Sequence, residues 1–128
     1  VDARDWGSAV CPSDLVRAEL WKEGLQILNT ATRADAISKV LGLGMKNKTV
    51  TYEGLMAGLS DPRVDTIYIL TDGQPYGGAM PNTGDILREI RRQNAVRHVV
   101  IHCISVGMNS SFLKQLAKEN HGQYTRVD

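Results

Sequence analysis

One carboxylate in the chain stands where a protein could use it for chemistry. The stretch VDTIYILTDGQPYGG begins at Val64, and its apolar part, rich in β-branched and aromatic residues, stops at Asp72. Such a run is typical of a strand. In open α/β sheets, ligands bind at the carboxyl ends of parallel strands, so an aspartate at that position is a candidate metal anchor or phosphate acceptor.

The same residues also have a simpler interpretation as a turn. Asp72 and Gly73 both favour turn conformations, and an Asp-Gly pair is a strong turn signal. Gly73 and two later glycines, however, have no side chain to shield the backbone, and Pro75 stiffens the loop. A ligand could therefore approach the backbone of this loop closely. On these residues alone, both interpretations stay open.

The elements that position this loop alternate between helical and strand patterns from Thr32 onward. The spacing predicts helices over 32–43, 51–59, 83–94 and 111–120, and strands over 65–71, 99–106 and 123–127. The strand 99–106 is apolar on both faces, as a central parallel strand should be. The predicted fold class is α/β: a Rossmann-like three-layer sandwich with a mostly parallel sheet flanked by helices.

The first of these helices is predicted from two signals. Thr32 and Asp35 have the spacing of a capping box, and four apolar residues fall on one face: Ala36, Ile37, Val40 and Leu41. The chain before it is harder to interpret, because the stretch DLVRAELW fits a strand or a helix. We therefore expect a poorly defined N-terminal segment over 1–31 and one α/β domain over 28–128.

Composition limits the classes of function. A chain of 128 residues with 42% hydrophobic content suffices for one core, and a net charge of +1 offers no field to recruit nucleic acid or an anionic membrane. No apolar run approaches the roughly 20 residues that cross a bilayer, so we expect the chain as given to be soluble. Its compartment is unknown, and an extracellular or cell-envelope location would fit a piece of a longer secreted protein.

Other reactive residues have structural interpretations. His98 and His102 share strand spacing but lack a third donor, so structural histidines are favoured over zinc ligands. Arg88 and its basic neighbours suit the solvated face of a helix, and Cys103 suits a buried thiol. No nucleophile, dinucleotide or P-loop motif supports an enzyme, which leaves a phosphotransfer or hydrolase α/β domain using Asp72 as the less favoured enzymatic alternative.

The order of elements, together with the motif TDGxP at residues 71–75, resembles the von Willebrand factor type A (VWA) domain, and in particular its bacterial members. The resemblance runs from about Leu28 to Arg126. It implies a divalent cation, usually Mg²⁺ (or Mn²⁺), held above the sheet in a metal-ion-dependent adhesion site (MIDAS). By matching position, Asp72 and Thr49 would be metal residues, with Thr51 as the competitor of Thr49 and with Gly73 and Pro75 in the supporting loop.

The residue types suit that metal, since magnesium prefers hard oxygen ligands. A vacant coordination position would accept an acidic side chain from a protein partner, so the resemblance implies adhesion or protein–protein interaction and no enzyme activity. The alternative is a degenerate, metal-independent interaction or structural module.

One element of the family pattern is missing from this sequence. The family carries a DxSxS stretch after its first strand, and no DxSxS occurs here. We therefore expect either the C-terminal portion of a longer product or a degenerate domain, with a metal site that is weak or lost.

Overall fold

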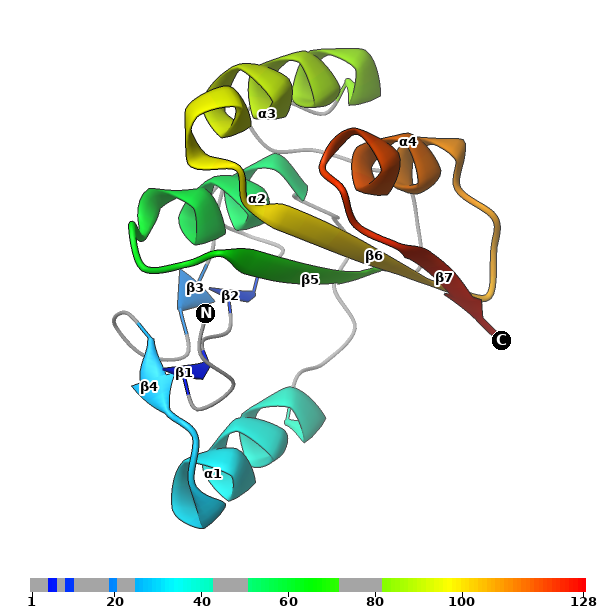
Figure 1. Ribbon diagram of the computed structural model, residues 1–128. Helices are drawn as coiled ribbons and strands as arrows, with labels where there is room; N and C mark the ends of the chain where they lie inside the picture. The colour runs from blue at the N-terminus through cyan, green and yellow to red at the C-terminus, as the bar shows by residue number, and fades with distance from the viewer. Residues whose placement is uncertain (1–4, 7–8, 11–18, 21–24, 43–50, 72–81) are drawn as a thin grey trace.

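The computed structural model describes residues 5–6, 9–10, 19–20, 25–42, 51–71 and 82–128 (Figure 1). Four two-residue strands near the N-terminus form two antiparallel pairs, β1 (Asp5–Trp6) with β4 (Gln26–Ile27) and β2 (Ala9–Val10) with β3 (Glu19–Leu20). The ambiguous stretch DLVRAELW thus has a strand at Glu19–Leu20, and its other residues lie outside the described part of the chain.

The main sheet is parallel and has the order β5-β6-β7, with β5 (Thr66–Thr71), β6 (Val100–Val106) and β7 (Tyr124–Val127). The register places Ile69 opposite Cys103, and Cys103 opposite Tyr124. The prediction of an α/β fold with β6 as a central parallel strand is confirmed.

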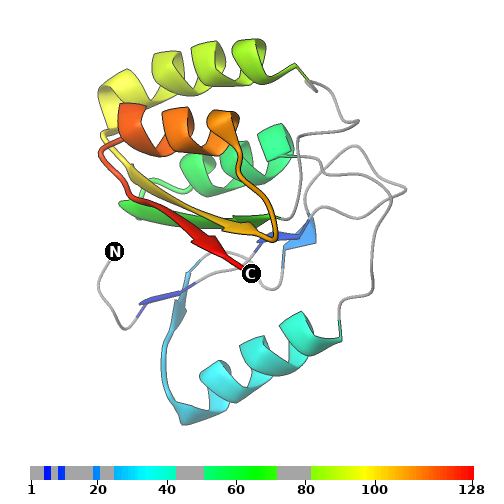
Figure 2. The ribbon, with the colours of Figure 1, turned by 90° about the vertical axis from the view of Figure 1, so that its right-hand side faces the viewer.

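Four helices accompany the sheet in the described residues: α1 (Thr30–Leu41), α2 (Thr51–Ser60), α3 (Thr83–Arg97) and α4 (Ser111–Glu119). Figures 1 and 2 show α2, α3 and α4 together on one face of the sheet, whereas α1 stands apart on the other side. The Rossmann-like three-layer arrangement therefore stays a prediction, because no described helix packs directly on the second face.

The core lies between the sheet and α2, α3 and α4. Along β6 the side chains alternate, so that Ile101, Cys103 and Ser105 are fully buried beneath the helices. The helices meet them with apolar residues at helical spacing: Leu55, Leu59, Ile86, Leu87, Ile90, Phe112, Leu113, Leu116 and Ala117. Burial raises the pKa of the Cys103 thiol to about 12, so this cysteine behaves as a small core residue.

Polar side chains cap the amino ends of α1, α3 and α4. Asn82 accepts a hydrogen bond from the backbone N–H of Asp85, and the predicted cap Ser110 accepts one from Leu113. The predicted cap of α1 is wrong. Asn29, not Thr32, precedes the helix, and the two side chains each accept a hydrogen bond from the other residue's backbone N–H. The reciprocal pair is a capping box three residues earlier than the predicted one.

The predicted inner face of α1 is also wrong in part. Ala36 is buried, but Ile37 is 49% exposed and Leu41 is 80% exposed. The side chain of Val40 lies outside the described residues. Helical periodicity identified the apolar positions correctly, but it could not say which of them the rest of the chain covers.

The turn from α4 into β7 requires a glycine. The backbone of Gly122 approaches β6 so closely that a Cβ built on it would lie 1.8 Å from the carbonyl oxygen of Ile101. The turn itself bonds to both elements, because Gly122 N–H donates to the carbonyl of Ala117 and Ile101 N–H donates to that of Asn120. Only a residue without a Cβ lets α4 and β6 approach to this separation.

We predict that Gly122→Ala lowers the free energy of unfolding by more than about 2 kcal/mol, because the added methyl group meets backbone atoms that cannot rotate away. The measurement is chemical denaturation, with Gly84→Ala as the control. Gly84 stands in the first turn of α3, and its nearest atom to a built Cβ is a side-chain oxygen at 3.2 Å. Equal stabilities of the two variants would contradict the close approach.

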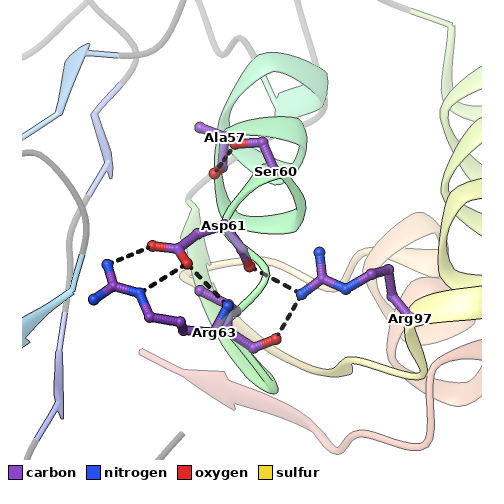
Figure 3. A network of polar contacts seen from close by, with 6 residues as sticks. Ala57, Ser60, Asp61, Arg63 and Arg97 are labelled. Atoms are coloured by element: carbon purple, nitrogen blue, oxygen red, sulfur yellow. Dashed lines mark hydrogen bonds and ion pairs between the residues drawn. The ribbon is translucent and has the colours of Figure 1, made fainter.

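A polar network at the amino ends of the strands joins α3 to the connection between α2 and β5 (Figure 3). The Arg97 guanidinium donates to three backbone carbonyls, those of Leu59, Asp61 and Val64, the latter two at 2.9 Å. The Arg63 guanidinium and backbone N–H bond the Asp61 carboxylate and hold its pKa below its usual range. Arg97 thereby bonds one of the last carbonyls of α2, that of Leu59, and two carbonyls of the connection that follows the helix.

We predict that Arg97→Lys destabilises the fold by about 1 to 2 kcal/mol, since one ammonium group cannot reach the three carbonyls that the planar guanidinium reaches. Arg88→Lys on the same helix is the matched control, because Arg88 makes an exposed pair with Asp85. Its effect should stay within about 0.5 kcal/mol. Thermal or urea unfolding of both variants tests this, and a similar loss in both would contradict the role of Arg97.

Candidate functional site at the carboxyl edge of the sheet

The carboxyl ends of the three parallel strands gather the segments that can form a site. β5 ends at Thr71, β6 at Val106 and β7 at Val127, all at one edge. Figure 2 turns this edge toward the viewer. The helix α2 precedes β5 and runs in the opposite direction, so its first residue, Thr51, lies at the same edge as Thr71. Loops at such an edge are where open α/β sheets bind ligands.

Of the predicted site residues, the structure describes one. Thr51 begins α2 and its side chain is buried. Thr49, Asp72, Gly73 and Pro75 lie outside the described residues, so their mutual arrangement stays a prediction. The described residues that flank them nevertheless lie at the same edge, because β5 ends at Thr71 and α2 begins at Thr51.

Sequence reasoning missed a second polar group at this edge. Ser105 is fully buried next to the end of β6, paired in register with Thr71 of β5. Its Oγ donates to the carbonyl oxygen of Met108 at 2.6 Å. A serine in a strand position otherwise occupied by apolar residues was the signal that could have revealed it.

The connection from β6 to α4 is fixed by further hydrogen bonds. The Tyr124 hydroxyl accepts from the backbone N–H of Ser110 at 3.2 Å and contacts the Met108 carbonyl at 3.4 Å. Gly107 has a φ of 76°, a conformation that favours glycine, and its N–H donates to the carbonyl of Val127. These bonds hold the loop in one shape and present Met108 at the surface.

The other reactive residues singled out in the sequence lie on α3 and β6. His98 ends α3 in a left-handed conformation. The Nδ1 atom of His102 accepts from the backbone N–H of Gln123, and the imidazole stacks on Tyr68. Arg88, Arg91 and Arg92 each pair with a carboxylate of Asp85, Glu119 or Glu89. The three arginines are exposed, as expected for the solvated face of a helix.

Within the described residues, no group of three or more His, Cys, Asp or Glu side chains could hold a metal ion. None of the helices in that part of the chain is long and apolar enough to cross a membrane. A scan against models of protein families and a search of curated proteins found no match for the chain.

We predict that Tyr124→Phe destabilises the β6–α4 connection by about 1 kcal/mol, because the backbone N–H of Ser110 loses its hydroxyl acceptor. Tyr68→Phe is the matched control, since that ring is 70% exposed on the open face of the sheet. Amide hydrogen exchange at residues 107–110 is the measurement. Faster exchange in Tyr124→Phe alone agrees with the geometry, and unchanged exchange contradicts it.

Proposed function

We propose that this chain is a VWA-type protein-interaction domain that binds an acidic group of a protein partner through a divalent cation at the carboxyl edge of its sheet. The observation that carries the proposal is that α2 begins at Thr51 and β5 ends at Thr71 at the same edge of the sheet. The segments before Thr51 and after Thr71 contain Thr49 and Asp72, the two metal residues that the resemblance implies. The parallel sheet and the helix order are also those that the resemblance implies.

The donor types agree with magnesium or manganese. The buried Thr51 side chain and the predicted residues Thr49 and Asp72 offer hydroxyl and carboxylate oxygens, and no thiolate or imidazole. Hard oxygen ligands are what magnesium prefers, with water completing its octahedron. In the proposal Thr49 ligates directly, and Asp72 ligates directly or through water. The cation supplies an open coordination position for the partner's carboxylate.

The proposed site is weak, for reasons of charge. Asp72 is the one carboxylate in the predicted ligand set, and Lys48 stands next to Thr49 in the sequence. The amino end of α2 also carries the positive end of the helix dipole, which opposes a cation. Affinity for hard cations rises with the number of charged ligands, so millimolar binding is the expected range.

Thermal unfolding with Mg²⁺, with Mn²⁺ and with chelator tests the cation site. A cation that binds only the folded state at ten times its Kd adds about 1.4 kcal/mol, which raises the Tm by a few degrees. We predict such a rise in the unsubstituted chain and none in Asp72→Ala. Asp61→Asn is the control at the opposite edge of the sheet and should keep the rise.

A melt that is indifferent to metal would contradict the cation site and favour the metal-independent interaction module. Partner binding distinguishes the two further, because Asp72→Ala abolishes it only if the carboxylate holds the cation.

Phosphotransfer through Asp72 is the remaining enzymatic alternative. Incubation with acetyl phosphate, followed by intact mass measurement, would reveal an aspartyl-phosphate adduct. The interaction proposal predicts no adduct, and an adduct that disappears in Asp72→Ala would replace it.

A further inference from the structure

The helix α4 begins at the carboxyl edge of the sheet, where the proposed cation site lies. It follows β6 and packs over β6 and β7, so its start lies beside the loop 107–110 and its last turn lies at the opposite edge (Figure 2). Two lysines of α4 are exposed, Lys114 toward its start and Lys118 in its last turn. They place the same charge toward the two edges of the sheet.

Lys114 differs from the exposed arginines in what it contacts. The exposed arginines of α3, like Arg126 of β7, each pair with a carboxylate. The ammonium nitrogen of Lys114 lies instead over the Tyr124 ring, 5.4 Å from its centroid. No carboxylate in the part of the chain that the structure describes pairs with Lys114. Its positive charge is therefore available to an acidic group from outside.

The ring contact also determines where that charge lies. The Tyr124 hydroxyl accepts from the backbone N–H of Ser110 and contacts the Met108 carbonyl, so the ring is anchored to the loop at the carboxyl edge. A cation over an aromatic ring is attracted by its π electrons, which restricts the lysine side chain before a partner arrives. Less side-chain entropy is then lost when the ammonium group pairs with an acidic group.

We infer that Lys114 binds a second acidic side chain of the partner whose first acidic group binds the cation, an inference that rests on the proposed function. The proposed cation lies at the end of β5, and Lys114 lies over Tyr124 of β7, two strand spacings or about 10 Å across the sheet. An extended peptide covers that distance in about three residues.

The partner segment that fits this edge is therefore extended and carries acidic residues at positions i and i+3. Its two middle residues would cross the loop that follows β6, because β6 lies between β5 and β7. Met108 in this loop is 38% exposed and would contact them. Lys114 thereby adds a spacing requirement to a site that otherwise selects a single carboxylate.

Binding of short peptides in the presence of Mg²⁺ tests the inference. The probes are the terminally blocked tetrapeptides Glu-Gly-Gly-Glu and Glu-Gly-Gly-Gln, which differ only in the second carboxylate, and binding is followed by the chemical shifts of backbone amides. We expect the unsubstituted chain to bind the first peptide about three to five times more tightly, a gain within the range of an exposed ion pair. Lys114→Gln should remove this preference, and Lys114→Arg should keep it.

Lys118→Gln is the matched control, because it removes the same charge from the last turn of the same helix, and it should keep the preference. Melts with Mg²⁺ separate the two proposals, since Lys114→Gln should keep the rise in Tm that the cation causes. If the rise occurs but the preference is absent, survives Lys114→Gln or is lost equally in Lys118→Gln, the inference is overturned and the cation site stands. If Mg²⁺ raises the Tm of no variant, the proposed function fails, and the inference with it.

Discussion

The pairing of β6 with β5 on one side and β7 on the other is the constraint on which the rest of the structure depends. It brings the three carboxyl ends to one edge and the three amino ends to the other. The helices then have one face to cover, and their apolar stripes pack on Ile101, Cys103 and Ser105 of the central strand. The glycine at 122 permits this pairing, since a side chain there would separate the start of β7 from β6.

The two edges of the sheet differ in what holds them. The amino edge is closed by side chains that bond backbone groups from distant parts of the chain. Arg97 joins α3 to the α2–β5 connection, and the buried amides of Asn94 and Asn120 join α3, the start of β6 and the end of α4. Such satisfied buried networks rigidify a fold. The carboxyl edge carries the loops, the hydroxyls of Thr51 and Ser105, and in the proposal the cation.

Local signals in the sequence predicted most elements correctly. Signals of this kind depend on neighbours within a few residues. They include the helical apolar spacing over 83–94 and 111–120, the cap at Ser110, and the strand β6, which is apolar on both faces. Features set by distant contacts could not be predicted in this way. Arg97 was missed because its acceptors lie more than thirty positions earlier in the chain. For the candidate site, the sequence predicted its edge of the sheet but neither Ser105 nor Tyr124.

The central claim is that a divalent cation binds at the carboxyl edge, and its location can be measured by paramagnetic broadening of backbone amide signals with Mn²⁺. The account predicts that amides around Thr51, Thr71 and Met108 broaden at low Mn²⁺ and recover with chelator, while those around Asp61 and Arg97 at the opposite edge stay sharp. Broadening confined to the opposite edge, or none beyond that of free Mn²⁺ in solution, would contradict it.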